Sequence, residues 1–506
     1  MTAIGIDYGT KYSAVSYLDS EGLPVLITDV TDINQKLTQS VVTLDAEYPL
    51  VGKEAKEFVD RNPSARLIKW SKLEIGISDK LFVDKKGRKW RHDAIAALVL
   101  AKLRKDVIKA LKMDVDKLTL TVPVHFVTER RRAIMQAALL AGLPKPQLLE
   151  EPIAAALYYE RNLARQNNTV LVYDFGAGTF DVSIIKKVED NIIVLGKAGG
   201  REIGGKYLDQ KFAKYLLNRI LVIAKQDPIP EAEIVSNFED DPHLSKILDL
   251  AEEWKVKLST QNRIDEKVEY KGDYYQLLVT RSQFEKCTSN LIEQTIELTL
   301  KCLAASDLTW QDINNIYLVG GSSCIPKVEE RVRIISGLKP SNIIINNPFE
   351  AVTLGAAIAN SSDNAVSDKL PLGTLGVTVW DNSKKKQTFH TCIEHNKLLP
   401  SSSKEKFYTN RQNQHVVDLE ISIKNTEGYL HTIGYCSFNL PKSCPINTQF
   451  EITIKYTEFS EVHVSFFIDK YKNHSNQVAM FKLEAEHEIP EWFEQQKALV
   501  QEFFDN

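Results

Sequence analysis

The sequence predicts a two-lobed α/β domain, followed by a β-sandwich domain and one short C-terminal helix. Up to about residue 360, apolar strand-like runs alternate with long helical patterns, as in α/β domains. Beyond about residue 375, short segments of alternating apolar and polar residues are separated by turns, which is typical of all-β domains. A glycine-containing turn between two strands also occurs twice, once near the start of each half of the α/β region.

Periodicity predicts the individual elements of the α/β region. Apolar residues at steps of three and four predict a helix at residues 91–112, and a continuous apolar run predicts a buried strand at 118–124. A second helix is expected at 128–142, where glycine and proline end the pattern. Paired strands are expected at 3–18 and again at 169–185.

Domain boundaries follow from changes in composition. Residues 1–362 form the expected α/β domain, and the polar segment 363–375, which contains proline and glycine, is the expected linker. Residues 376–486 carry the alternating strands of the sandwich, and 487–506 predict the short helix. The apolar residues expected to pack this helix against the sandwich are Trp492, Leu499 and Phe503.

Composition and charge exclude several classes of function. The 506 residues carry a net charge of −4, which argues against a broad nucleic-acid-binding surface. The six cysteines show no CxxC spacing, so neither a zinc site nor a disulfide framework is expected. The N-terminus does not resemble a signal peptide, and no apolar run is long enough to span a membrane. We therefore expect a cytoplasmic protein without nucleic-acid or membrane partners.

The repeated turn carries the first chemical prediction. Apolar residues lead to Asp7 in one copy and to Asp174 in the other, and an aromatic residue and a glycine follow each aspartate. Glycine lets backbone N–H groups approach a phosphate closely, and an aspartate at each strand end can hold hydrated Mg²⁺. One such turn alone would fit a plain β-hairpin at least as well as a phosphate site. Two copies in two related halves favour a clamp on a phosphate ligand.

The motifs resemble, in their order along the chain, those of the seventy-kilodalton heat-shock chaperones, the DnaK family of the actin-like ATPase superfamily. The matching segments are IGIDYGTKYS, VGKEAKEFVDRNP, LTVPVHF, AGLPKPQLLEEPIAAAL, VYDFGAGTFDVS, EIGGKYLD, YLVGGSSCIPKV and NPFEAVTLGAAI. The resemblance implies an actin-like ATPase domain whose ligand is ATP or ADP with Mg²⁺. It also implies a monovalent cation, K⁺, near the phosphates.

The resemblance assigns residues to the phosphate and metal end of the site. Asp7 and Asp174 would order metal-bound water, and Asp181 would help to hold the monovalent cation. Lys11 stands where family members often have a second threonine, and it could add charge to the phosphate site or point to solvent. The residues implied near the phosphates are Gly9, Thr10, Lys11, Tyr12, Gly176, Gly178, Thr179, Gly204 and Gly205.

The catalytic residues are also implied by the resemblance. Hydrolysis needs an in-line water and neutralisation of charge more than covalent chemistry, and in the family a first-lobe lysine positions that water. Lys72, in KLEIG, is the best match, but the preceding segment is longer than usual, which makes Lys69 the rival. Either lysine could instead be a solvated surface residue. The implied catalytic set is Lys72, Glu151, Asp174 and Thr179.

The nucleoside end of the site matches the family in part. The segment EEWKVKLS resembles the family's adenosine-contacting helix and places Glu252, Lys255 and Ser259 on one helical face. Gly320, Gly321 and Ser322 would bring backbone against the adenosine. Two residues depart from the family pattern, namely Cys324, where arginine is usual, and Phe349, where an acid is usual.

The C-terminal region resembles the family's peptide-binding sandwich, in which an extended client segment would add backbone hydrogen bonds. The residues implied to line the peptide groove are Val377, Val379, Phe407, Val417 and Leu419. The linker is polar where the family has an apolar run, and almost all of the helical lid is missing, so bound peptide should exchange quickly. A J-domain protein and a nucleotide-exchange factor are the other implied partners, although residues that help to engage J-domains differ here.

Three functions remain open on the sequence. The matched catalytic motifs favour an ATP-hydrolysing chaperone that binds unfolded or client polypeptide segments. The polar linker and the missing lid are also consistent with a nucleotide-bound regulatory scaffold or co-chaperone with little ATP turnover. A sugar kinase of the same superfamily is disfavoured by the β-rich C-terminal region.

Overall fold

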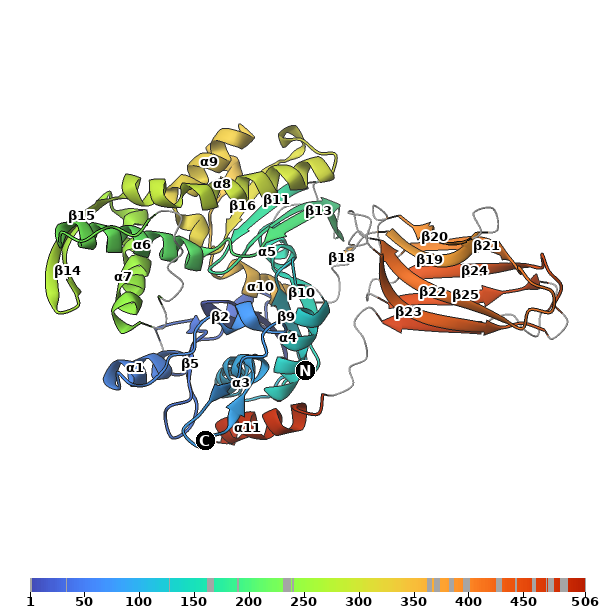
Figure 1. The fold of residues 1–506 in the computed structure, drawn as a ribbon, viewed down its shortest axis with the longest axis horizontal. Coiled ribbons are helices and arrows are strands. Elements are labelled where there is room, and N and C mark those ends of the chain that lie inside the picture. Colours follow the sequence, from blue (N-terminus) through green and yellow to red (C-terminus); the bar gives the residue numbers. More distant parts are fainter. Residues whose placement is uncertain are drawn as a thin grey trace. The chain divides into compact units, whose positions relative to one another are not determined.

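The chain forms two compact units in the computed structural model (Figure 1). The first unit contains residues 1–189, 196–363 and 491–506, and the second contains 190–195 and 364–490. The structure describes residues 2–32, 34–126, 128–161, 168–188, 191–230, 238, 241–361, 366–367, 374–381, 386–394, 401–424, 430–441, 444–456, 461–469, 471, 477–482 and 490–505.

Two sheets of the first unit share one plan. In the first sheet β1 (Ala3–Tyr8) is antiparallel to β2 (Tyr12–Leu18) and parallel to β9 (Lys117–Val122). In the second sheet β11 (Asn168–Phe175) is likewise antiparallel to β12 (Phe180–Val188) and parallel to β16 (Asn315–Val319). The outer strands are β10 (Gln147–Glu150), β3 (Pro24–Leu26) and β4 (Thr38–Gln39) in the first sheet, and β17 (Ile343–Ile344) and β13 (Asn191–Gly200) in the second. The second sheet ends with β18 (Val366–Ser367), which belongs to the second unit, as do residues 191–195 of β13.

Helices that the sequence predicted are confirmed. The expected helix at 91–112 is α3 (His92–Leu111), and the one at 128–142 is α4 (Thr128–Leu140). The other helices of the first unit are α1 (Lys53–Arg61), α2 (Ser71–Glu74), α5 (Glu151–Glu160), α6 (Gly205–Ile223), α7 (Pro242–Thr260), α8 (Arg281–Ala305), α9 (Pro326–Ser336) and α10 (Ala351–Ile358). Among its described residues, the first unit also contains three two-stranded sheets. Their strands are β5 (Val42–Thr43) with β6 (Leu50–Val51), β7 (Phe82–Val83) with β8 (Lys89–Trp90), and β14 (Arg263–Tyr270) with β15 (Asp273–Thr280).

Small residues join the late helix α10 to the start of the chain. A side chain at Gly355 would place its Cβ 1.7 Å from the carbonyl oxygen of Ala154 on α5. One at Gly5 on β1 would place its Cβ 2.3 Å from the backbone nitrogen of Ala357. Both contacts need glycine because only hydrogen fits there. The close packing fixes α5 and α10 beside the strand that leads into the first glycine turn.

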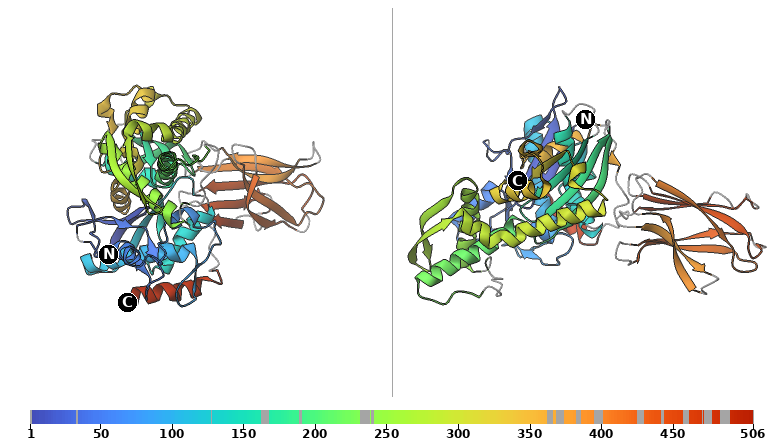
Figure 2. Two further views of the ribbon diagram at one scale, coloured as in Figure 1. Left: turned by 60° about the vertical axis from the view of Figure 1, so that its left-hand side comes forward. Right: turned by 90° about the horizontal axis from the view of Figure 1, so that it is seen from above.

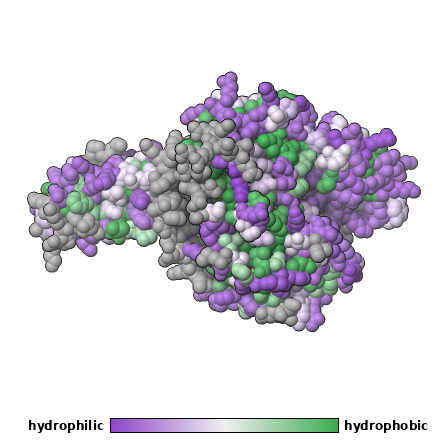
Figure 3. All heavy atoms as spheres, turned by 180° about the vertical axis from the view of Figure 1, so that it is seen from behind, coloured by the Kyte–Doolittle hydropathy of each residue, from purple (hydrophilic) through white to green (hydrophobic). Residues whose placement is uncertain are grey.

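The core of the first unit explains the strongly apolar sequence of α3. Most of this helix is buried, including the continuous run Ala94–Leu103. On the face shown in Figure 3, hydrophilic side chains cover most of the periphery of the first unit and hydrophobic ones gather toward its middle. Among the described helices, none is both long enough and apolar enough to cross a membrane.

The C-terminal helix α11 (Phe493–Asp505) packs in the first unit and not on the sandwich (Figures 1 and 2). The expectation that its apolar residues cover the sandwich is therefore wrong. Phe493 and Val500 belong to the same core as α3, and Trp492, Leu499 and Phe503 pack against that core. An amphipathic pattern predicts that a helix has a buried face, but it does not specify which apolar surface covers that face.

The second unit contains two four-stranded antiparallel sheets, as the alternating pattern predicted (Figure 2). One sheet has the order β20 (Lys386–Ile393), β19 (Thr374–Asp381), β22 (Val416–Lys424) and β23 (Leu430–Asn439). The other has the order β21 (Ser401–Tyr408), β24 (Gln449–Tyr456), β25 (Glu461–Phe467) and β26 (Gln477–Lys482).

Part of the expected linker is ordered structure. Val366 and Ser367 form β18, which pairs with Ile192 and Ile193 of β13. The sandwich begins at Thr374, and the side chain of Leu375 is fully buried in its core. The rest of the expected linker, up to residue 373, lies outside the described residues.

Candidate functional site

A cavity of about 360 Å³ lies in the first unit beside the two glycine turns. It is lined by most of the residues that the sequence singled out. These are Asp7, Gly9, Thr10, Lys11, Tyr12, Lys72, Glu151, Asp174, Gly176, Thr179, Gly205, Glu252, Lys255, Ser259, Gly320, Gly321 and Ser322. Three others do not line it: Gly178, Gly204 and Asp181.

The second turn packs closely against Thr10 of the first turn and against the start of α6. A Cβ built on Gly178 would lie 3.0 Å from the side chain of Thr10 in the first turn, and a Cβ on Gly204 would lie 2.5 Å from Gly178. The N–H group of Gly205 donates to the carbonyl oxygen of Gly176 at 3.0 Å. Close packing therefore requires glycine at Gly178 and Gly204.

In the lining of the cavity, carboxylates surround one buried lysine. The Nζ atom of Lys72 lies 2.7 Å from Oε1 of Glu151, and both side chains are buried. Thr121 on β9 donates to Oδ1 of Asp7 at 2.8 Å and so orients that carboxylate. Asp174 on β11 also lines the cavity, with 7% of its surface exposed. The two turns thus contribute one aspartate each to the same space.

The ionisation of these groups reflects burial and crowding. Burial disfavours the charged form of Lys72, but the carboxylates of Glu151 and Asp7 outweigh it, so the pKa of Lys72 is raised. The pKa of Glu151 is raised to about 7, because burial and the nearby carboxylate of Asp7 raise it by more than the ammonium group of Lys72 lowers it. Burial and the carboxylates of Glu151 and Asp181 raise the pKa of Asp174 well above its ordinary value. The site therefore carries more acidic than basic groups, which suits a bound cation.

Local structure separates Lys72 from its rival. Trp70 adopts a left-handed conformation (φ 63°), and the one-turn helix α2 that follows directs Lys72 inward. The buried guanidinium of Arg130 supports α2 by donating to the carbonyl oxygen of Lys72 at 2.7 Å. Lys69, by contrast, forms an ion pair with Asp249 at 3.0 Å, and about a third of its side chain is exposed. Lys69 does not line the cavity.

The helix α7 presents the three predicted polar residues to the cavity. Glu252 is ion-paired with Lys11, which also lines the cavity. Lys255 forms an ion pair at 2.7 Å with the buried carboxylate of Asp209 on α6. Ser259 donates to the carbonyl oxygen of Lys255 at 3.0 Å. Burial raises the pKa of Asp209 to about 6, although Lys255 opposes this.

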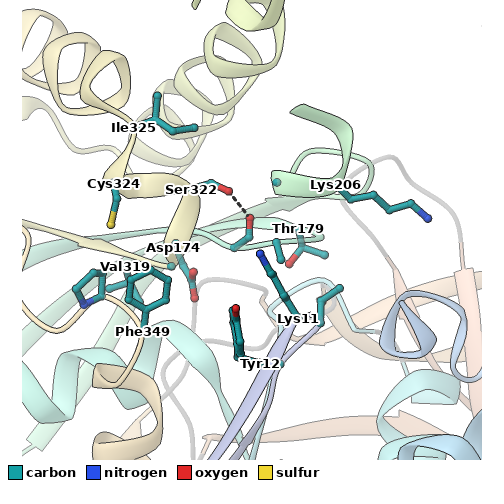
Figure 4. A pocket seen from close by; sticks show the side chains of 18 of the residues that line it. Lys11, Tyr12, Asp174, Thr179, Lys206, Val319, Ser322, Cys324, Ile325 and Phe349 are labelled. Carbon is teal, nitrogen blue, oxygen red and sulfur yellow. Dashed lines mark hydrogen bonds between the residues drawn. The ribbon is translucent and has the colours of Figure 1, made fainter. Parts of the chain in front are cut away.

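The end of the cavity beside Phe349 is apolar. Figure 4 shows Phe349 and Cys324 on one side of the space that Asp174 and Tyr12 face. A Cβ on Gly321 would lie 2.7 Å from the ring of Phe349, so the glycine lets this ring pack on the backbone. Additional apolar lining comes from Val256, Val319, Ile325, Pro348 and Val352.

A short helix, η2 (Gly321–Cys324), ties this end of the cavity to the second turn. The hydroxyl of Ser322 donates to the carbonyl oxygen of Gly176 at 2.8 Å (Figure 4). Gly320 has φ 80°, a conformation that favours glycine, and it directs the chain away from β16. Ser322 thus holds the apolar end against the turn that carries Asp174.

Several residues that shape the site were missed by sequence reasoning. Thr121 orients Asp7, His125 lies 3.1 Å from Asp181 through its Nδ1 atom, and Arg130 supports Lys72. Thr121 and His125 lie within the quoted segment LTVPVHF, but alternation alone does not say which polar side chain meets an aspartate. Within the described part of the chain, no three His, Cys, Asp or Glu side chains are grouped as a direct metal site.

The residues expected to line a peptide groove divide into two groups. Val377, Val417 and Leu419 are at most 5% exposed and belong to the core of the sandwich. Val379 and Phe407 are only partly buried against that core. The first three therefore pack in the sandwich core, and Val379 and Phe407 are the more accessible of the five.

Comparisons with known proteins agree with the arrangement of the motifs. The family model described as Hsp70 protein matches residues 3–453. "Chaperone protein DnaK" of Thermotoga neapolitana is 32% identical over 487 residues, which cover 91% of this chain and 77% of the relative. The protein of the same name from Mycoplasma mycoides is 31% identical over 430 residues, which cover 83% and 69%. The chain therefore belongs to the Hsp70 family.

Proposed function

We propose that the chain is an ATP-binding and ATP-hydrolysing chaperone that binds client polypeptide segments. The observation that carries this proposal is the cavity, where an aspartate from each of two like turns and the buried Lys72–Glu151 pair meet. The shared strand order of the two sheets supports an actin-like arrangement of two lobes around that cavity.

The two ends of the cavity suit the two ends of a nucleotide. The polar end, with Thr10, Lys11 and Thr179, would receive the phosphates, and the apolar end around Phe349 would receive the base. Glu252 and Lys255, which line the same cavity, would contact the ribose. Backbone N–H groups and hydroxyls of the two turns would bind the phosphates, together with the lysines Lys11 and Lys206 that line the cavity.

The excess of buried carboxylates fits a divalent cation. Asp7 and Asp174 would hold Mg²⁺ through its water ligands, and the ion would neutralise charge on the phosphates when bound. Asp181, which contacts His125, is the proposed contact for K⁺.

The chain's own residues then position the attacking water. Lys72 keeps its proton, because the surrounding carboxylates stabilise the ammonium group, and it can orient the water by hydrogen bonding. Glu151 holds the ammonium group in place at 2.7 Å. Thr179, which lines the cavity in the second turn, would contact the γ-phosphate. That Lys72 lines the cavity supports a role toward a bound ligand in addition to its ion pair with Glu151.

Client binding would belong to the sandwich, with Val379 and Phe407 as the accessible apolar contacts. We propose a J-domain protein and a nucleotide-exchange factor as further partners, and the cytoplasm as the location. The resemblance of the two DnaK proteins along most of their length supports these proposals.

Single-turnover hydrolysis of ATP tests the proposal directly. The purified chain is mixed with substoichiometric radiolabelled ATP and Mg²⁺, and phosphate release is followed with and without a client peptide. We expect hydrolysis with weak stimulation by peptide. Tight nucleotide binding without hydrolysis would contradict the enzyme proposal and leave a scaffold. No nucleotide binding would contradict the assignment of the cavity.

A further inference from the structure

The terminal helix α11 is built into the first unit as part of its core. Val500 is 1% exposed and Phe493 is 5% exposed, and both belong to the same hydrophobic cluster as α3 and α4. Trp492, Leu499 and Phe503 extend this contact. Figures 1 and 2 show the helix lying alongside α3. Exposing these side chains to water would be costly, because each is largely buried.

A buried polar side chain gives the contact its register. Gln496 is 3% exposed, and its amide group bonds to two backbone atoms just before α3. Its Oε1 atom accepts from the N–H group of Arg91 at 3.0 Å, and its Nε2 atom donates to the carbonyl oxygen of Lys89 at 3.0 Å. Arg91 is the residue that precedes the first turn of α3. The glutamine of α11 thereby satisfies backbone groups that would otherwise be buried without partners.

Charge and aromatic contacts complete the interface. Glu502 forms ion pairs with Arg88 and with Lys86, the latter at 3.0 Å. The guanidinium of Arg91 lies 4.7 Å from the ring centre of Trp492. Similar contacts join Arg104 to Phe504 and Lys105 to Phe503, each at 4.5 Å. An acidic, aromatic helix therefore lies on a basic surface that matches it.

We propose that α11 is a permanent second anchor of the sandwich unit. The segment 364–490 runs between two parts of the first unit in the chain, so the docked helix attaches the sandwich through its C-terminal connection as well as through the N-terminal linker. The anchor holds in every nucleotide state, because its contacts belong to a folded core and lie on residues outside the candidate cavity. The helix is then not free to cover a bound client.

Cutting the linker tests the anchor without relying on nucleotide. A specific protease site is placed within residues 368–373 of the full chain, and the cleaved protein is run on size exclusion at about 5 μM. We expect the two fragments to elute together, because α11 stays docked. Val500→Asp buries an unpaired charge and should separate them, and Gln496→Ala should weaken their association about tenfold. Lys497→Gln changes an exposed residue of the same helix and should leave the fragments together.

Each outcome decides the proposal. Separation of the wild-type fragments would overturn it, as would continued association of the Val500→Asp fragments. The cleaved protein is also run with ADP and with ATP, each with Mg²⁺, and association should persist. Release with ATP alone would show a nucleotide-gated contact and refute permanence. Failure of the proposed ATPase function would leave the nucleotide-free result intact, so the two proposals fail separately.

Discussion

Replacing Lys72 with alanine should abolish most ATP hydrolysis while nucleotide binding remains. The Nζ atom of Lys72 lies 2.7 Å from Glu151 in a site where only 3% of the lysine is exposed, so its charge is little screened. Removing one preorganised hydrogen-bond donor from such a site typically slows the chemical step by about 10²- to 10³-fold, or roughly 3 to 4 kcal/mol. We expect a loss of that size in single-turnover hydrolysis.

The alanine variant also leaves Glu151 buried without its partner, which can destabilise a fold by about 3 to 5 kcal/mol. The double variant Lys72→Ala with Glu151→Gln removes that charge, and Glu151→Gln alone measures what the loss of the Glu151 carboxylate does to hydrolysis. The double variant should regain thermal stability without regaining hydrolysis. Recovery of both would show that the loss came from the fold.

Lys69→Ala is the matched control for this prediction. Its ion pair with Asp249 is partly exposed and should contribute at most about 1 kcal/mol, so hydrolysis should change less than about fivefold. The reasoning would be refuted if Lys69→Ala were the slower variant. It would also be refuted if wild type and Lys72→Ala hydrolysed bound ATP at the same rate.

Three further predictions concern other parts of the first unit. Lys11→Thr breaks the ion pair with Glu252 beside the cavity and should speed nucleotide dissociation about two- to fivefold in stopped-flow measurements. Phe349→Ala removes the aromatic wall and should weaken ATP binding about fivefold, whereas binding of inorganic triphosphate should not change. Burial raises the pKa of Asp106 to about 6, although the ammonium group of Lys102 at 2.7 Å opposes this shift. Because this pKa is higher in the folded than in the unfolded chain, Asp106 stabilises the fold fully below about pH 4, and this stabilisation is lost as the pH rises through 6. The unfolding free energy of wild type minus that of Asp106→Asn should therefore fall by about 2 to 3 kcal/mol from pH 4 to 7.

Each of these measurements has a contrary result. An unchanged dissociation rate in Lys11→Thr would mean that the ion pair does not retain nucleotide. Equal weakening of ATP and triphosphate binding in Phe349→Ala would place the ring away from the base. A stability difference for Asp106→Asn that does not vary with pH would show that this carboxyl has the same pKa folded and unfolded.

The sequence alone predicted the strands and the two turns, because these depend on neighbouring residues. Asp7 and Asp174 each follow an apolar run and precede a glycine, and that local pattern is enough to predict a strand ending in a turn. Their convergence on one cavity was also predictable, because the same pattern occurs twice.

Only the tertiary structure decided between residues whose local patterns are alike. Lys69 and Lys72 lie three residues apart, and the left-handed Trp70 and the support from Arg130 determine which one faces the cavity. The apolar face of α11 was predictable from its sequence, but its place on α3 was not. Burial rewards any well-matched apolar surface, so the choice between two surfaces depends on contacts such as those of Gln496, which join residues about 400 positions apart in the chain.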